Sequence, residues 1–198
     1  MSAFASTPAQ HATSTSSGRA VTDRGLHAAI EALDSVMVHL RPAGPRDEAA
    51  FLAILTDPSV DEWWQSTDPA ADARELATQD EIAAWAIEAG GSVVGVIQAA
   101  EETDPQYRHA SIDIVLAGSA QGRGLGSDAL RAVVRWLIEQ RGHHRLTIDP
   151  AASNERAIRA YSKVGFRPVG VMRQYERARD GTWHDGVLME LLADDFGG

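Results

Sequence analysis

Residues 121–126 read Gln121-Gly122-Arg123-Gly124-Leu125-Gly126, with three glycines in six positions. The apolar run at 112–116 precedes this stretch and predicts a strand. After it, apolar residues recur at helical spacing, at Leu130, Val133, Val134, Leu137 and Ile138. The glycines are therefore predicted to form a turn between a strand and a helix. Such a turn directs unpaired N–H groups and a helix dipole at one point, so it predicts an anion site, most often for phosphate.

Two familiar phosphate motifs can be tested against this turn. A P-loop is excluded because no Gly-Lys-Ser/Thr follows the glycines. The dinucleotide fingerprint Gly-x-Gly-x-x-Gly fits Gly122 and Gly124 but ends on Ser127, although Asp149 lies at about the distance expected for a ribose-binding acid. It remains a competitor, disfavoured because only one strand-helix-strand unit fits after the glycines. The pattern Gln/Arg-x-x-Gly-x-Gly/Ala is matched in full.

That pattern resembles the pyrophosphate loop of the GNAT superfamily of acyl-coenzyme A dependent N-acyltransferases. The second GNAT signature, Asn-x-x-Ala-x-x-x-Tyr-x-x-x-Gly-Phe, follows in the correct order over residues 154–166. The resemblance covers about residues 36–193. Within the superfamily the sequence is most similar to aminoglycoside 6'-N-acetyltransferases, and the residues that carry this are Glu62-Trp63-Trp64, Ser111-Ile112-Asp113, the Asp149-Pro150 step and the second signature.

The resemblance implies an α/β (α+β) fold of GNAT type, with a mixed, mostly antiparallel sheet of about seven strands and helices on both faces. Strands are expected at 36–41, 83–87, 93–100, 112–116 and 146–148, and a closing hairpin at 169–177 and 183–192. Helices are expected at 45–56, after the glycines and after Asn154, with one further helical piece in the acceptor-side region 57–79. Residues 1–34 are expected to be a disordered or weakly ordered extension, and 35–198 a single domain.

The resemblance also assigns the co-substrate, acetyl-CoA, to named residues. Backbone N–H groups of the turn are expected to hold the diphosphate, and Asn154 to meet the pantetheine arm, although Asn154 alone would also suit a helix N-cap. The expected cofactor-binding residues are Val115, Gln121, Gly122, Arg123, Gly124, Leu125, Gly126, Ser127, Asn154 and Tyr161.

Acyl transfer to an amine needs a proton acceptor and a proton for the departing thiolate. Asp113 is the candidate base, and the alternatives are a simple amine-binding group or a solvent-facing carboxylate in a half-buried strand. Asp149 is expected beside it as a substrate contact, unless it only shapes the turn at Pro150. Tyr161 is the candidate general acid, or otherwise a core aromatic. Trp63 and Trp64 are candidates for stacking on a sugar ring, against an ordinary packing role.

Charge is distributed unevenly along the 198 residues, whose net charge is -10. Residues 57–113 carry thirteen acidic and two basic side chains, whereas 114–198 carry ten acidic and twelve basic ones. An acidic acceptor region would attract a polycationic amine, unless its carboxylates only serve solubility. Nucleic acid is disfavoured as a partner because it requires a basic footprint. We expect a polycationic small-molecule amine as the substrate, which the resemblance implies is an aminoglycoside, and a monomer or homodimer as the enzyme.

The chain has no cysteine, so a reducing cytoplasm is the expected compartment and transfer is expected to proceed without a thiol nucleophile. The histidine spacing predicts no metal site. No apolar run approaches the length of a membrane span, and the N-terminus does not read as a secretory signal. Two other functions remain open: a siderophore-type or protein N-terminal acyltransferase, and a non-catalytic acyl-CoA-binding module.

Overall fold

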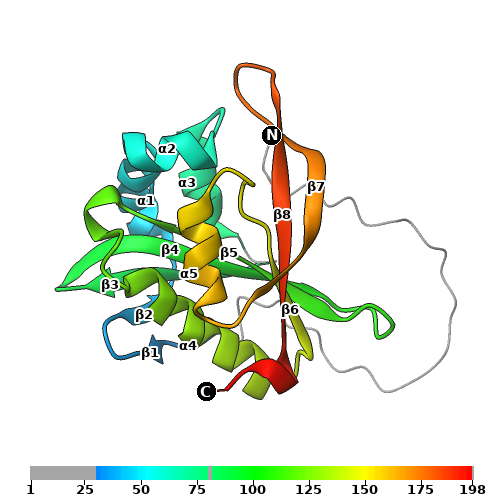
Figure 1. Cartoon of the computed structure of the whole chain (residues 1–198). Helices are drawn as coiled ribbons and strands as arrows, with labels where there is room; N and C mark the ends of the chain where they lie inside the picture. Colours follow the sequence, from blue (N-terminus) through cyan, green and yellow to red (C-terminus); the bar gives the residue numbers. More distant parts are fainter. Residues whose placement is uncertain (1–29, 80–81, 198) are drawn as a thin grey trace, which may run out of the picture.

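The computed structural model describes residues 30–79 and 82–197. Within them, eight strands form one sheet in the order β1-β2-β3-β4-β5-β6-β8-β7 (Figure 1). The strands are β1 (Leu33–Asp34), β2 (His39–Pro42), β3 (Ala83–Ala89), β4 (Ser92–Glu102), β5 (His109–Leu116), β6 (Arg145–Ile148), β7 (Arg167–Arg177) and β8 (Trp183–Leu192). Only β5 and β6 pair in parallel. The mixed, mostly antiparallel sheet predicted from the sequence is confirmed, with the short β1 in addition to the expected strands.

Five α-helices cover the two faces of the sheet in the part of the chain that the structure describes: α1 (Glu48–Leu55), α2 (Pro58–Trp64), α3 (Pro69–Thr78), α4 (Leu125–Glu139) and α5 (Glu155–Ser162). Short 3-10 turns precede α1 at Pro45–Asp47, precede the glycine turn at Gly118–Ala120 and follow β8 at Ala193–Asp195.

The acceptor-side region holds two helices where the sequence predicts one helical piece. Both begin with the same local signal, because Asp57 and Asp68 cap them by accepting the N–H groups of Ser59 and Ala71, and proline occupies the first helical position. The seven residues of α2 are too few to show helical periodicity, which is why pattern alone missed this helix.

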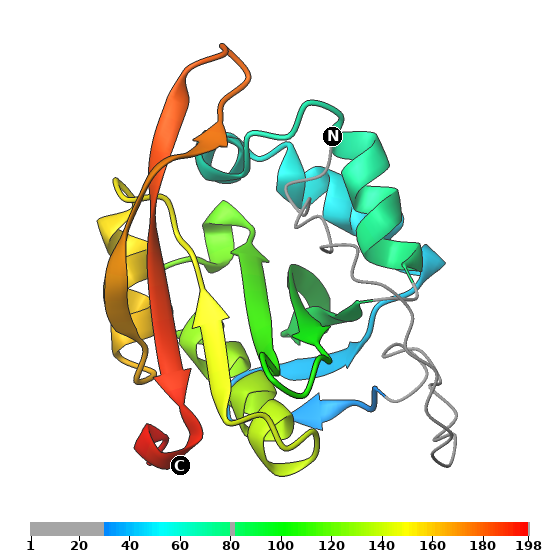
Figure 2. The same ribbon diagram turned by 90° about the vertical axis from the view of Figure 1, so that its right-hand side faces the viewer.

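The sheet lies between two helical layers, with α4 and α5 on one face and α1 to α3 on the other (Figures 1 and 2). The alternation of side chains along β3 shows how the sequence supplies a hydrophobic core to each helical layer. Trp85 and Ile87 join the core under α4, whereas Ala84 and Ala86 join the core under α1 to α3. Trp85 meets Trp136 of α4 edge to face, with ring centroids 5.1 Å apart.

The expected N-terminal extension lies outside the described residues as far as residue 29. The structure describes its last five positions, and β1 within them pairs with β2. No helix among residues 30–79 and 82–197 is long and apolar enough to cross a membrane.

The parallel pair β5 and β6 forms a junction that shapes the rest of the molecule. In the described chain, these strands pair only at Ala110 with Leu146 and at Ser111 with Thr147. Beyond that point β5 continues to Leu116 and pairs with β4 alone, while β6 ends at Ile148. The two strands therefore part in the middle of the sheet, and β5 leads from this junction to the glycine turn.

Candidate active site

The glycine turn has the backbone geometry that its sequence predicts. Gly122 and Gly124 have φ values of +73° and +87°, a region that side chains disfavour, and Gly124 is the N-cap of α4. Gln121 closes the turn by donating from its side-chain amide to the Leu116 carbonyl at 2.8 Å. A Cβ on Gly126 would lie 3.0 Å from the Leu116 side chain, so a small residue is needed there as well.

The same turn gathers unpaired backbone donors. In the described chain, none of the N–H groups of residues 122–127 donates to a protein acceptor, and the first such bond of the helix runs from Asp128 to the Gly124 carbonyl. The fifteen-residue α4 adds its dipole at the same point. Leu125 is buried, so it offers only its N–H, while Arg123 is exposed beside the turn. This arrangement suits a diphosphate.

Asp113 and Asp149 occupy equivalent positions across the junction. Ser111 pairs with Thr147, and each aspartate lies two residues further along its strand direction, on the same side of the parallel pair. Asp113 belongs to β5, and Asp149 follows the end of β6. The structure therefore brings together the two carboxylates that the sequence predicts to be neighbours.

The electrostatics of the junction raise the pKa of both acids. Burial, together with the nearby Asp149 and Glu176, raises the pKa of Asp113 to about 7, while a hydrogen bond from Gln98 opposes the shift. Gln98 is held in turn by Gln79, whose side-chain amide donates to it at 2.9 Å. The pKa of Asp149 is also raised by burial, opposed by hydrogen bonding with Tyr175.

Three further residues complete the junction and were not predicted from the sequence. Tyr175 and Glu176 come from β7, and Gln98 pairs with Asp113 from β4. Burial, opposed by His184, raises the pKa of Glu176, and Asp149 adds to this shift. The alternation of β7 carries no signal for these residues, because its burial pattern is exposed along almost the whole strand.

Tyr161, on α5, lies close enough to the two aspartates to interact electrostatically with both. Burial raises the pKa of its hydroxyl, and the charges of Asp113 and Asp149 raise it further, so the phenol stays protonated at neutral pH. The residue also packs against the core beneath α4. Both interpretations of Tyr161 weighed from the sequence, a core aromatic and a group facing the junction, therefore describe part of its environment.

The remaining predicted residues lie around the junction with mixed roles. Asn154 caps α5 by accepting the Ala157 N–H at 3.1 Å, as the simpler interpretation expects. Val115 lies on the part of β5 that has no β6 partner, and packs toward α1 to α3. Trp64 packs in that same layer and donates to Asp72 at 3.4 Å, while Trp63 is partly exposed on α2. Contact of these four with a ligand stays a prediction.

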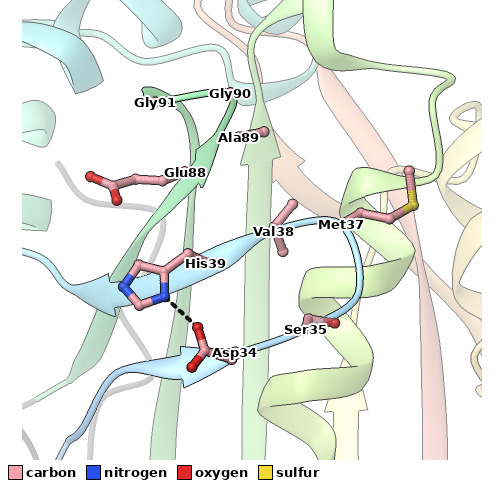
Figure 3. A pocket seen from close by; sticks show the side chains of 9 residues that line it. All are labelled: Asp34, Ser35, Met37, Val38, His39, Glu88, Ala89, Gly90 and Gly91. Atoms are coloured by element: carbon pink, nitrogen blue, oxygen red, sulfur yellow. Dashed lines mark hydrogen bonds and ion pairs between the residues drawn. The ribbon is translucent and has the colours of Figure 1, made fainter.

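A hollow of about 310 Å³ lies beside the glycine turn but contains none of the predicted site residues (Figure 3). Met37, which lines it, is 3.7 Å from where a Cβ of Gly124 would stand. No lysine or arginine is among the residues that line this hollow, and its acids are paired, Asp34 with His39 and Glu88 with Arg41, so it offers no cation for a phosphate group. Across the described ranges, no cluster of three or more histidine and acidic side chains is arranged to hold a metal ion.

Comparisons with known proteins agree with this geometry. The family model described as an acetyltransferase (GNAT) domain matches residues 38–167. The aminoglycoside N(6')-acetyltransferase type 1 of Klebsiella pneumoniae is 31% identical over 155 residues, covering 68% of this chain and 76% of the relative. The [ribosomal protein uS5]-alanine N-acetyltransferase of Escherichia coli is 32% identical over 76 residues, covering 38% of this chain and 39% of the relative.

A solved structure of AAC(6')-Ib in complex with ribostamycin and coenzyme A superposes with a TM-score of 0.66 at 27% identity, covering 81% of this chain and 96% of that one. The family match includes residues 121–127, whose unpaired N–H groups suit a diphosphate, and both Asp113 and Asp149. The chain therefore belongs to the GNAT acetyltransferase family and is an acetyl-CoA-dependent N-acetyltransferase.

Proposed function

We propose that this enzyme acetylates the 6'-amino group of an aminoglycoside. The observation that carries the proposal is the acidic character of the junction, where burial raises the pKa of Asp113 and Asp149, and where Asp149 and Glu176 raise the pKa of Asp113 further above its ordinary value. Among the described residues, only neutral donors oppose the shifts at Asp113 and Asp149. A substrate that brings several ammonium groups would relieve this repulsion. The 31% identity to an aminoglycoside N(6')-acetyltransferase supports the same substrate.

Each junction residue has a role in this proposal. Asp113, with its pKa of about 7, accepts a proton from the attacking ammonium and so frees the amine nitrogen for attack on the thioester carbonyl. Asp149 and Glu176 hold further ammonium groups of the substrate. Tyr161, which stays protonated, supplies a proton to the departing sulfur. The amine nitrogen gains the acetyl group and loses its second proton, which restores the Tyr161 hydroxyl, while the C–S bond breaks and the thiol is released.

The cofactor would lie along the part of β5 that has no β6 partner. Its diphosphate would meet the N–H groups of residues 122–127, which have no protein acceptor in the described chain. From there its arm would pass Val115 toward Asp113, because β5 leads from the turn to the junction. This path places the thioester between Tyr161 and the two aspartates. Trp63 and Trp64, on α2, would border the acceptor.

A protein N-terminal acyltransferase is the second candidate, favoured by the 32% identity to a ribosomal-protein alanine acetyltransferase. That match covers 38% of this chain, against 68% for the aminoglycoside enzyme. A peptide N-terminus also brings a single ammonium group, which would leave most of the acidic repulsion at the junction in place. The aminoglycoside is therefore the better fit, in the cytoplasm that we expect for this enzyme.

The test is release of free thiol from acetyl-CoA by the full-length protein with four amines: kanamycin, tobramycin, a peptide beginning with alanine, and hydroxylysine. We expect turnover with the two aminoglycosides. A matched control is an aminoglycoside that carries a hydroxyl group in place of the 6'-amine, which should not be acetylated. Turnover confined to the peptide or to hydroxylysine would overturn the proposal, and acetylation of the control would overturn the 6' position.

The variant Tyr161→Phe distinguishes the proposed enzyme from a non-catalytic acyl-CoA-binding module. In a catalyst this change lowers turnover by about 10- to 100-fold and leaves acetyl-CoA affinity in calorimetry within about twofold, because the proton donor is lost and the glycine turn is untouched. Binding of acetyl-CoA without turnover of any amine in the wild-type protein would instead identify a binding module.

A further inference from the structure

The hairpin of β7 and β8 contains a pronounced bulge beside the junction. Met172 pairs with Gly186, and Glu176 pairs with His184, so residues 173–175 lie opposite the single residue Asp185. Gln174 at the centre of the bulge has a φ of +51°, which is uncommon for a residue other than glycine. Such conformations persist where neighbouring groups hold them, and they gather at functional sites.

Asp185 is the residue that holds this bulge. Its carboxylate accepts the backbone N–H of Gln174 at 2.8 Å. Its backbone carbonyl accepts the N–H of Ala152 at 2.8 Å, in the loop that follows Asp149, and the neighbouring Val187 donates to the Pro150 carbonyl at 2.9 Å. A single residue therefore ties the bulge of β7 to the segment that carries Asp149.

The bulge changes where two consecutive side chains point. Side chains of neighbouring strand residues normally face opposite sides of a sheet. Tyr175 and Glu176 are neighbours, yet both interact with Asp149. The Tyr175 ring lies over Gly186, where a Cβ would come within 2.9 Å of it, and half of the residue, 52%, stays exposed. An unbulged β7 would turn one of these side chains away from the junction.

We propose that Asp185 is a positioning residue that fixes Tyr175 as an acceptor-binding residue. Tyr175 interacts with the same Asp149 carboxylate that binds the substrate ammonium, and its exposed ring contacts the adjoining part of the acceptor. Asp185 stabilises the left-handed backbone of Gln174, which directs the Tyr175 side chain toward the junction. This inference rests on the proposed function for the identity of the acceptor, and on the hairpin geometry for the role of Asp185.

The test compares steady-state kinetics of Asp185→Ala and Asp185→Asn. Loss of the acceptor for the Gln174 N–H should raise KM for the amine by about tenfold, the usual effect of losing a hydrogen bond to a charged group, and leave KM for acetyl-CoA within about twofold. Asp185→Asn keeps an oxygen acceptor, so its KM for the amine should stay close to the wild-type value. Glycine adopts the left-handed conformation without strain, so adding Gln174→Gly to Asp185→Ala should also restore KM.

Asp180→Ala is the matched control, because Asp180 caps the Thr182 N–H at 2.9 Å in the same hairpin but at the turn. It should leave both KM values unchanged. The inference is overturned if Asp185→Ala leaves the amine KM unchanged, raises both KM values equally, or is rescued by neither asparagine nor Gln174→Gly.

A readout without substrate separates this inference from the proposed function. Burial and Asp149 raise the pKa of Tyr175, so its ionisation, isolated at 295 nm by subtracting Tyr175→Phe, lies above the ordinary range for tyrosine. In Asp185→Ala it should move toward that range. An unchanged titration overturns the positioning role. Absence of turnover with any aminoglycoside, with the titration shifted as expected, overturns the proposed substrate alone.

Discussion

Glu101 and Asp113 are half-buried acids on adjacent strands of one sheet, and their environments shift their pKa values in opposite directions. The Glu101 side chain on β4 is 8% exposed and meets Arg141 at 2.8 Å and the His143 ring at 2.6 Å. These partners outweigh burial and lower the pKa of Glu101 to about 2. Asp113 on β5 has acidic neighbours instead, and its pKa rises to about 7. Burial is common to both, so the charges placed nearby decide the outcome.

The difference separates a structural acid from a functional one. The Arg141 guanidinium also lies 5.7 Å from the ring centre of Trp136, so the Glu101 cluster fastens β4 to the end of α4. Every charge in that cluster has a partner within the protein. At the junction, only neutral donors of the described residues oppose the raised pKa values of Asp113 and Asp149, so a positively charged ligand would supply the compensating charge, as expected of a binding and proton-transfer site.

The largest effect is expected for Asp113→Asn. It removes the proton acceptor, so kcat/KM should fall by about 10² to 10⁴ fold at pH 8. Because the pKa of Asp113 is raised on folding, its contribution to stability is greatest below about pH 4 and is lost as pH rises toward 7. The variant should therefore have a higher Tm than wild type at pH 8 and no such advantage below pH 4, measured by calorimetry. Retained activity would show that Asp113 only binds the amine.

Glu101→Gln sharpens the comparison as the matched change at the structural acid. It takes the negative partner from Arg141 and His143, and should lower the free energy of unfolding by about 3 kcal/mol at pH 7 in urea titrations. A lowered pKa gives stability that is present above the ordinary value near 4.5 and is lost as pH falls toward 2, so the deficit should shrink in acid. Activity of the folded fraction should be retained. A loss of kcat in fully folded Glu101→Gln would contradict a purely structural role for Glu101.

The smallest expected effect concerns the electrostatic coupling between Asp113 and Asp149. Asp149→Asn removes a negative neighbour of Asp113, so the pKa of Asp113 should fall. The acidic limb of the pH profile of kcat/KM should then move to lower pH by about one unit, the usual size of such an interaction. The amine KM should rise, because an ammonium contact is lost. If the acidic limb does not move, the ionisation that it reports is that of a group other than Asp113.

The sequence was sufficient for the parts of the site that are local in the chain. The turn at 121–126 needs only its own glycines and the helix that follows, and Asp113 and Asp149 meet because each comes at the same step of a parallel pair. Tyr161 follows from the same signature as Asn154, although the side chain of Asn154 is engaged in capping α5.

Other features depend on contacts that no local pattern records. Tyr175 and Glu176 reach Asp149 only because of a register shift that is held by Asp185, ten residues further along the chain than Tyr175. Gln98 reaches Asp113 through the pairing of β4 with β5. The side chains that partner Glu101 come from the segment after α4, about forty residues away, so the structural role of Glu101 could not be told from its sequence neighbours.

The raised pKa of Asp113 at the junction can be measured by titrating the carboxyl carbon of this residue. In the full-length protein labelled with ¹³C at the aspartate carboxyl carbon, the Asp113 resonance can be identified by its loss in Asp113→Asn. We expect a midpoint near pH 7, which falls when a polycationic amine is bound. A midpoint below pH 5 in the free protein would contradict it.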